Sequence, residues 1–314
     1  MNVLITGAAG NLGSRVARHL AQRHELKLLV HKRQPPPDLI SLPNVNVHPA
    51  DLARVDTLHD ACSGADCIVH LAGVLFAPKP AEFLPKTNLG YVQNLLAAAG
   101  QGGVRKFILV SFPHVEGETT PAHPATDRVD REPEVVHFRT RLAAERAVLA
   151  AANTTSMTPI ILRAGVVYGP GIKLIEAARR LLRYRLLAVW ARPTWIHLIS
   201  LPDFLAAITA AVESPVARGI YNVCDDAPLT LQEFLDRLAA HFRYPKPHRL
   251  PESLFHAAAG LIETTAYILG TAAPLTRDII RAGMTSSVAD NRRMKQELLP
   301  ALSYPSFEQG VALL

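Results

Sequence analysis

The amino-acid sequence predicts an α/β fold: a doubly wound parallel sheet with helices on both faces, followed by a smaller C-terminal lobe. Strand-length apolar runs alternate with helical patterns through the first half of the chain, and a glycine-rich turn follows the first apolar run. Parallel strands need crossover connections, which helices usually supply. The predicted strands are Val3–Thr6, Lys27–Val30, Val45–His48, Cys67–Leu71, Phe107–Ser111 and Ile160–Ala164. The predicted helices are Gly13–Gln22, Thr87–Gly100, His137–Ala152 and Ile172–Leu187.

The glycine-rich turn has the pattern of a phosphate-binding site. Gly7, Gly10 and Gly13 are spaced by three residues directly after the first strand. Gly7 permits the tight turn, Gly10 lets backbone N–H groups approach a pyrophosphate, and Gly13 allows close helix–strand packing. The helix start at Asn11 and Leu12 favours negative charge. In this strand–turn–helix context, the glycines predict a Rossmann-type dinucleotide site.

The end of the second strand bears on which dinucleotide binds. An acidic residue there hydrogen-bonds the ribose hydroxyls of NAD, whereas a basic residue accommodates the extra phosphate of NADP. This sequence has His31, Lys32 and Arg33 at that place. The absence of Asp or Glu favours NADP(H) over NAD(H), with NAD(H) as the alternative.

Composition and charge describe a globular chain with no nucleic-acid site. The sequence is 49% hydrophobic and 19% charged, with a net charge of +6. Its basic residues form no tail, and the densest basic stretch, 179–185, is typical of a solvated helix face. Cys62, Cys67 and Cys224 form no disulfide framework, and no metal-ligand spacing is present. With no signal-peptide pattern, we expect a cytoplasmic protein that binds no metal.

The segment Glu116–Pro133 is rich in Pro, Thr and charge, which predicts a long and partly mobile loop. After Gly169 the pattern breaks into shorter pieces, with helices near 172–187, 202–213 and 229–242 and strands near 195–201 and 219–223. Material of this kind normally builds the lobe that covers a substrate. We expect residues 1–168 to form the dinucleotide-binding core. Residues 169–314 then form mainly the substrate-binding lobe, with some segments returning to the core.

Residues 254–269 are strongly apolar but are interrupted by His256 and Glu263. The run is too short to span a bilayer core comfortably. It predicts a helix that is buried or that contacts a membrane surface, without a transmembrane segment.

Several further segments match one family in chain order. Asp51 and Leu52 follow the third strand, the run His70, Leu71, Ala72 and Gly73 closes the fourth, Asn88 lies in the next helix, and residues 163–171 read R-A-G-V-V-Y-G-P-G. Over nearly its whole length the chain resembles the extended short-chain dehydrogenase/reductase family, which contains NAD(P)-dependent epimerases, dehydratases and dihydroflavonol- or hydroxysteroid-type reductases. The resemblance implies that Asp51 and Leu52 contact the adenine and that Leu71, Ala72, Gly73 and Asn88 lie beside the cofactor.

The resemblance also implies a catalytic Ser or Thr, a Tyr, and a Lys four residues after the Tyr, and this chain departs at all three. Phe112 stands at the Ser/Thr position with Ser111 one residue earlier, and His137 and Arg141 stand for Tyr and Lys. Arg141 is still able to bind a ribose and supply charge. His137 is able to donate or accept a proton near neutrality, and its alternative is a histidine without a chemical role. Phe112 offers no hydrogen bond, so a substrate oxygen has only Ser111 or His114 to bind there.

The substrate implied is a small, fairly apolar carbonyl or hydroxy compound. Arg192 is the one sign of a nucleotide-sugar clamp, whereas the segment from Leu250 through Asp278 is similar to the apolar C-terminal helices of flavonol- and sterol-type reductases. The hypothesis is an atypical NADP(H)-dependent oxidoreductase or epimerase/isomerase that uses His137. The alternatives are an accessory or sensor protein that only binds nucleotide, and a non-redox enzyme on the same fold. The resemblance also implies a homodimer paired through the helices near 87–100 and 137–152.

Overall fold

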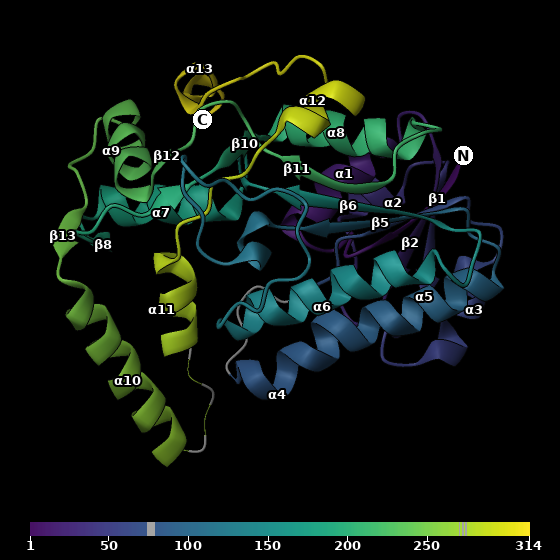
Figure 1. The fold of residues 1–314 in the computed structure, drawn as a ribbon, viewed down its shortest axis with the longest axis horizontal. Coiled ribbons are helices and arrows are strands. Elements are labelled where there is room, and N and C mark those ends of the chain that lie inside the picture. The colour runs from purple at the N-terminus through teal and green to yellow at the C-terminus, as the bar shows by residue number, and fades with distance from the viewer. Residues whose placement is uncertain (74–78, 270, 272, 274) are drawn as a thin grey trace.

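A seven-stranded parallel sheet forms the centre of the computed structural model, which describes residues 1–73, 79–269, 271, 273 and 275–314. The strand order is β11-β6-β5-β4-β1-β2-β3. Figure 1 shows this sheet between layers of helices. The strands are β1 (Asn2–Thr6), β2 (Glu25–Val30), β3 (Val45–Pro49), β4 (Cys67–His70), β5 (Lys106–Ser111), β6 (Thr158–Ala164) and β11 (Gly219–Val223). The order reverses on the two sides of β1, which confirms the predicted doubly wound α/β fold.

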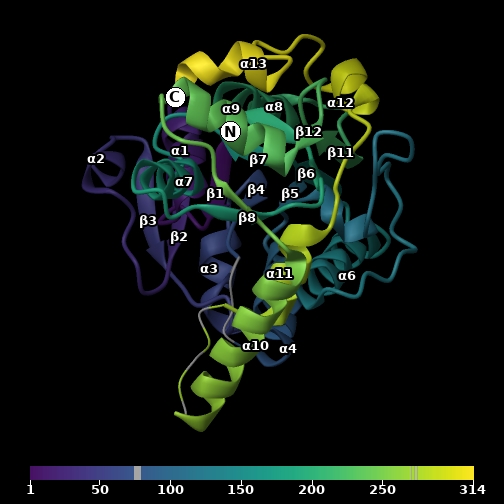
Figure 2. The same cartoon turned by 90° about the vertical axis from the view of Figure 1, so that its left-hand side faces the viewer.

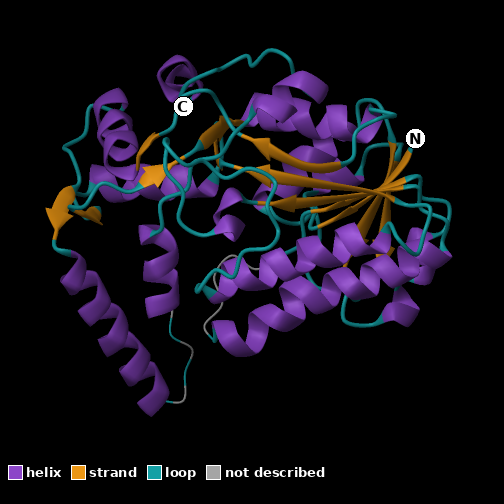
Figure 3. Cartoon of the chain, viewed as in Figure 1, coloured by secondary structure: helices purple, strands orange, loops and turns teal. Residues whose placement is uncertain are grey.

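Helices cover both faces of this sheet, as Figure 3 shows. Alternate side chains of a strand point to opposite faces, so Val3 and Ile5 enter one apolar core and Leu4 enters the other. The first face is covered by α1 (Asn11–Leu20) and α8 (Leu201–Glu213), and the second by α3 (His59–Cys62), α5 (Tyr91–Gln101) and α6 (Val136–Ala151).

The C-terminal half contributes to the core and also builds smaller sheets beside it. Strand β11 pairs with β6, and α8 packs on α1, so both return to the core. Three two-stranded sheets join β7 with β10, β9 with β12 and β8 with β13. Their strands are β7 (Val166–Tyr168), β8 (Ala188–Trp190), β9 (Trp195–Ile196), β10 (Leu198–Ser200), β12 (Leu229–Thr230) and β13 (His248–Leu250). The helices of this half are α7 (Lys173–Arg183), α9 (Leu231–His241), α10 (Glu252–Ile268), α11 (Arg277–Met284), α12 (Arg292–Glu297) and α13 (Phe307–Gly310), followed by η4 (Val311–Leu313).

The helix predicted over 87–100 is composite. The chain runs from α4 (Pro80–Leu84) through a π-helical segment, η2 (Pro85–Gly90), into α5. Pro85 has no backbone N–H to continue the regular ladder, which accounts for the irregular turn at this point. The remaining short elements of the first half are α2 (Pro37–Ile40), η1 (Val55–Thr57) and η3 (Pro113–Glu116). The predicted helix 172–187 also ends early, at Arg183, because Arg185 takes a φ of 56°.

The loop after η3 is tied down at several points, so the expectation of a partly mobile loop is not supported. The Glu116 carboxylate accepts hydrogen bonds from the backbone N–H groups of Thr126 and Arg128, at 3.0 and 3.1 Å. Further along, the Thr119 and Ala125 N–H groups donate to carbonyls in the segment 286–288. These contacts join the loop to the C-terminal half, a pairing that its composition does not reveal.

Helix α10 extends away from the body of the protein (Figure 2). Leu254, Leu261 and Ile268 are 52%, 70% and 74% exposed, and their seven-residue spacing places them along one face. Of the two interpretations of residues 254–269, a fully buried helix is therefore wrong. Among the described residues, none of the helices combines the length and the hydropathy needed to cross a bilayer.

Candidate active site

The turn between β1 and α1 has the backbone geometry of a phosphate site. Gly7 has a φ of 81°, and a Cβ there would lie 2.7 Å from the Ala72 nitrogen. A Cβ on Gly13 would lie 2.1 Å from the Gly7 carbonyl oxygen. In the described structure, α1 begins at Gly10 without a side-chain cap and without an acidic residue in its first turn. The positive end of the helix is therefore available to an anion.

Asn11 uses its side chain to hold a neighbouring loop. Its amide nitrogen donates to the Gly171 carbonyl at 2.9 Å, and its amide oxygen accepts from the Lys173 N–H at 3.0 Å. Arg15 donates to the same Gly171 carbonyl at 2.7 Å. This side-chain amide is thus occupied within the protein, and Leu12 beside it packs against the apolar core. Sequence reasoning missed Arg15, whose partner lies 156 residues away.

The predicted adenine-side residues gather after β2 and β3. His31, Lys32 and Arg33 are exposed in a bend directly after β2. The His31 Nε2 atom lies 3.7 Å from a carboxylate oxygen of Asp51, which also accepts a hydrogen bond from the Ala53 N–H. Leu52 is buried, and its carbonyl accepts from Asn94 at 2.9 Å. Because β2 and β3 are adjacent and parallel, their carboxyl ends open on one edge of the sheet.

The fourth-strand run is joined to the first strand by a short hydrogen-bond chain. The Ala72 N–H donates to the Thr6 hydroxyl at 3.2 Å, and that hydroxyl lies 2.9 Å from His70 Nδ1. Burial, with a smaller contribution from Arg141, lowers the pKa of His70 to about 3, so its ring is neutral at pH 7. The chain holds Leu71, Ala72 and Gly73 beside the glycine turn.

His137 and Arg141 lie one turn apart on α6 and face the ends of β4 and β5. Arg141 approaches Gly73 so closely that a Cβ there would lie 2.6 Å from the guanidinium Nη2 atom. Asn88, in η2, donates to His137 Nδ1 at 3.3 Å and to the Thr140 hydroxyl at 3.0 Å. The structure therefore brings together four of the predicted residues, Gly73, Asn88, His137 and Arg141, which span 68 positions of the chain.

Aromatic rings form one wall beside His137. The Phe112 ring stacks on the His137 imidazole, with centroids 5.0 Å apart and planes at 17°. His114 and Phe138 complete the cluster, with their ring centroids 5.1 Å apart. Phe112 thus supplies an apolar surface at the position where the family resemblance implies a Ser or Thr, and Phe138 is an addition that sequence reasoning missed.

Burial sets the charge state of the ionisable groups. It lowers the pKa of His137 to about 4, with Arg141 and His114 adding to the shift. It likewise lowers the pKa of His114 to about 4. The pKa of Arg141 falls to about 10 through burial, an effect that Glu145 partly offsets. At pH 7 the site therefore holds three neutral imidazoles, those of His70, His114 and His137, and one guanidinium cation.

Buried polar atoms converge here without partners among the described residues, which is the condition of a site that awaits a ligand. They are His70 Nε2, Asn88 Oδ1, Ser111 Oγ, His137 Nε2, and Nε and Nη1 of Arg141. A ribose hydroxyl both donates and accepts, so it matches the Arg141 donors and the Asn88 acceptor together. With the free start of α1 for a pyrophosphate, these residues fit a nicotinamide dinucleotide.

A buried ion cluster fixes α6 behind the site. Arg163, on β6, pairs with Glu145 of α6 at 2.7 Å and with Glu116, and all three side chains are almost fully buried. Glu145 lies one turn beyond Arg141. Both carboxylates therefore have a structural role, because they hold α6 to β6 and to the 116–133 loop.

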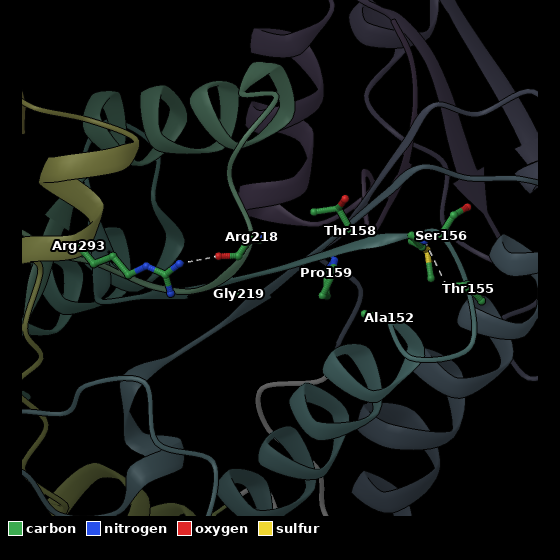
Figure 4. Close-up of a pocket in the computed structure, with 9 residues that line it drawn as sticks. Ala152, Thr155, Ser156, Thr158, Pro159, Arg218, Gly219 and Arg293 are labelled. Carbon is green, nitrogen blue, oxygen red and sulfur yellow. Dashed lines mark hydrogen bonds between the residues drawn. The ribbon is translucent and has the colours of Figure 1, made fainter.

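A surface hollow of about 460 Å³ lies elsewhere (Figure 4). It is lined by Ala152, Thr158, Arg218 and Arg293, at the amino ends of β6 and β11. Since parallel strands begin at this edge, it is the edge opposite the glycine turn. Arg293 already donates to the Arg218 carbonyl at 2.8 Å. The hollow therefore has no part in the candidate site.

Comparison with known proteins agrees with this geometry. The profile of the NAD dependent epimerase/dehydratase family matches residues 3–224. A 2-alkyl-3-oxoalkanoate reductase of Stenotrophomonas maltophilia is 27% identical, over 78% of this chain and 77% of that protein. A ceramide reductase of Caulobacter vibrioides is also 27% identical, over 86% and 80%.

Solved structures show the same fold at lower identity. The dTDP-glucose 4,6-dehydratase DesIV of Streptomyces venezuelae, solved with NAD bound, has a TM-score of 0.79 and 20% identity, over 99% of this chain and 95% of that chain. The UDP-glucuronic acid 4-epimerase of Bacillus cereus, also with NAD, has a TM-score of 0.78 and 18% identity, over 100% and 97%. The profile match spans well over half of the sequence, and the chain therefore belongs to the NAD dependent epimerase/dehydratase family, within the extended short-chain dehydrogenases/reductases.

Proposed function

We propose that this protein is an NADP(H)-dependent oxidoreductase that interconverts a small, fairly apolar ketone and its alcohol, with His137 in the place of the usual tyrosine. The observation that carries the proposal is the set of unpartnered buried polar atoms on Asn88, Ser111, His137 and Arg141, next to the glycine turn. Burying such groups without partners is costly, so their convergence favours a bound ligand.

The bound cofactor would supply or accept the hydride. Backbone N–H groups around Gly10 would hold its pyrophosphate, and Asp51 and Leu52 would lie beside the adenine. Lys32 and Arg33 are exposed and without an acidic partner among the described ion pairs, which supports a role in binding the extra phosphate of NADP.

The protein's own groups would bind the substrate oxygen. His137 Nε2 is the nearest candidate for a hydrogen bond to it, and the Arg141 charge would offset negative charge that develops during reduction. Phe112 and Phe138 would exclude water from the apolar side of the substrate. Ser111 precedes Phe112 in the chain, and His114 belongs to the aromatic cluster. Both would make secondary contacts with the substrate. Because His114 is neutral at pH 7, it would bring no charge to these contacts.

The names of two relatives support the substrate class. One is described as a reductase of a 2-alkyl-3-oxoalkanoate, which carries a ketone and an alkyl branch, and the other as a ceramide reductase. The aromatic wall suits an apolar ketone of this kind. We further propose that residues 169–314 mainly build the substrate-binding lobe over this wall.

Two other functions rest on specific observations. The departures at all three catalytic positions favour an accessory or sensor protein that binds NADP(H) without turnover. The family's epimerases favour an isomerase, or a non-redox enzyme that leaves the nicotinamide unchanged overall. A redox enzyme oxidises NADPH as it converts its substrate. An epimerase or other non-redox enzyme converts its substrate without net oxidation of NADPH. An accessory protein binds NADPH but neither oxidises it nor converts a substrate.

Titration and turnover together test the proposal. NADPH and NADH are titrated by fluorescence, and NADPH oxidation is followed by absorbance with a panel of 3-oxo esters. We expect tighter binding of NADPH than of NADH, and turnover that His137→Ala abolishes while the Kd for NADPH stays within about threefold. His123→Ala is the matched control, because His123 is an exposed histidine of the 116–133 loop. Turnover unchanged in His137→Ala would contradict the role of His137.

We also propose two further associations. Helices α5 and α6 lie side by side on the second face of the sheet, which supports a homodimer paired through them. The exposed apolar face of α10 supports contact with a membrane surface.

The three buried free cysteines are consistent with a reducing cytoplasm.

A further inference from the structure

We propose that Thr140 and Asn88 hold His137 in the tautomer that carries its proton on Nε2, so that His137 meets the substrate oxygen as a neutral hydrogen-bond donor. The chemical use of this donor rests on the proposed function. The tautomer itself depends only on contacts among three side chains of the free protein.

The chain of contacts begins at Thr140. Its hydroxyl lies 2.9 Å from the Val136 carbonyl and 3.1 Å from the His137 carbonyl, both of which only accept. A hydroxyl has one proton, and this proton is taken by the preceding turn of α6. Toward Asn88, 3.0 Å away, the Thr140 oxygen therefore acts as an acceptor.

This fixes which way the Asn88 amide points. The group facing Thr140 must be the amide nitrogen, because an amide oxygen there would meet an oxygen whose proton is already engaged. The same nitrogen lies 3.3 Å from His137 Nδ1. An amide nitrogen has two protons, so one serves Thr140 and the other serves His137.

His137 Nδ1 therefore accepts a hydrogen bond and carries no proton. A neutral imidazole keeps one ring proton, which must lie on Nε2. The ring is neutral at pH 7, since its pKa is lowered to about 4 by burial and by the neighbouring Arg141 cation. Nε2 is buried and has no partner among the described residues, so its N–H is unused.

The tautomer decides what His137 offers to a substrate. An Nε2–H group hydrogen-bonds a carbonyl oxygen and stabilises the negative charge that grows on it, as a neutral imidazole is known to do in other enzymes. It has no lone pair on Nε2 with which to take a proton from an alcohol. In a reduction, the hydride of the cofactor would go to the carbonyl carbon. The oxyanion formed would be held by the Nε2–H group and would take its proton from water, since a neutral imidazole that lost this proton would become an imidazolate anion. The arrangement therefore suits the reduction of a ketone, and Thr140 and Asn88 are positioning residues that act through His137.

Nitrogen-15 NMR of the free protein tests the tautomer directly. The imidazole nitrogens are labelled, and the His137 signals are assigned by their loss in His137→Gln. At pH 7 we expect a protonated-type shift at Nε2 and an unprotonated-type shift at Nδ1. The opposite pattern in the wild-type protein would overturn the inference, whatever the variants do.

Variants of Asn88 and Thr140 test whether these two residues set the tautomer of His137. Asn88→Asp replaces the donor by a carboxylate, so a proton should appear on Nδ1. Thr140→Val should leave a mixture of tautomers, and Thr140→Ser, which keeps the hydroxyl, should restore the wild-type spectrum. Asn153→Asp is the control, since Asn153 is an exposed asparagine just after α6. An Nδ1 that stays unprotonated in Asn88→Asp would overturn the role of Asn88.

These outcomes are separate from the fate of the proposed function. If the spectra are as expected but His137→Ala retains full turnover, the tautomer stands and the catalytic role of His137 falls. If Asn88→Asp does not fold, the wild-type spectrum and the Thr140 pair still decide the question.

Discussion

At the residue scale, Arg141 carries much of the proposal that a ligand binds here. Its guanidinium is buried, keeps its charge at pH 7, and leaves Nε and Nη1 without partners among the described residues. An uncompensated buried cation lowers the stability of the free protein, whereas a bound ribose and pyrophosphate would compensate it. The same side chain should therefore weaken the free fold and strengthen cofactor binding.

Arg141→Met tests whether the same side chain destabilises the free protein and strengthens cofactor binding, because methionine fills similar space without charge. We expect the Kd for NADPH to rise by about 10- to 100-fold, the equivalent of about 1.5–3 kcal/mol for hydrogen bonds to a charged group. In the free protein we expect the free energy of unfolding in urea to stay equal or to increase. Arg139→Met, an exposed arginine on the same helix, is the control. A destabilised free protein with unchanged binding would show that Arg141 is structural.

His137 should make stability depend on pH. Its pKa is about 4 in the folded protein and about 6.5 in the unfolded chain, so between these values the unfolded state binds more protons. Above pH 6.5 this histidine is neutral in both states and does not lower the free energy of unfolding. As the pH falls from 6.5 toward 4, the unfolded chain binds a proton there first, and the free energy of unfolding decreases. For this residue alone we expect the free energy of unfolding to fall by about 2 kcal/mol between pH 7 and pH 5.

Urea denaturation at the two pH values checks this for wild-type protein and for His137→Gln. The variant should lose less stability on acidification than the wild type, and His123→Ala should lose the same amount as the wild type. Equal pH dependence in wild type and His137→Gln would contradict the lowered pKa.

At the element scale, the ion cluster of Glu116, Arg163 and Glu145 connects three segments. It joins the 116–133 loop, β6 and α6, and so fixes the helix that carries His137 and Arg141. Removing one partner of a buried ion pair leaves uncompensated charge, whereas removing all charges together is often tolerated.

Arg163→Met should therefore lower the free energy of unfolding by about 3–5 kcal/mol, since it strands two buried carboxylates. Combining it with Glu116→Gln and Glu145→Gln should recover part of that loss, as measured by urea denaturation at pH 7. A triple variant no more stable than Arg163→Met would mean that packing around Arg163, and not its charge, holds these elements together.

Helix α10 provides a second prediction at this scale. Its exposed leucines at 254 and 261 would enter the headgroup region of a membrane surface. We expect the protein to float with neutral lipid vesicles in a density gradient, and Leu254→Ser with Leu261→Ser to reduce the floating fraction severalfold. Val216→Ser, at an exposed apolar residue away from α10, is the control. Flotation unaffected by the double substitution would exclude this surface.

At the scale of the whole molecule, local patterns predicted the architecture well. The six predicted strands and the glycine turn are in place, because alternation and Gly spacing act over a few residues. Contacts between distant residues could not be read in this way. Arg163 with Glu116, Arg15 with Gly171, and Asn88 with His137 each depend on how the sheet order brings segments together.

Contacts between distant residues also limited what the sequence could predict about the candidate site. The alignment with the family placed His137 and Arg141, but composition said nothing about their burial or their unpartnered atoms. The stacking of Phe112 on His137 could not be predicted either, because the two residues are 25 positions apart in the chain. The residues proposed for the site could thus be named from the sequence, whereas their burial and their unpartnered atoms could not.

Transfer of a labelled hydride distinguishes a redox enzyme from a protein that only binds NADPH. Protein is incubated with NADPH carrying deuterium on the transferable C4 position and with an apolar 3-oxo ester, and the alcohol product is examined by mass spectrometry. We expect an alcohol with one deuterium on the former carbonyl carbon, formed by wild-type protein and not by His137→Ala. Tight NADPH binding without labelled alcohol from any ketone of the panel would contradict it.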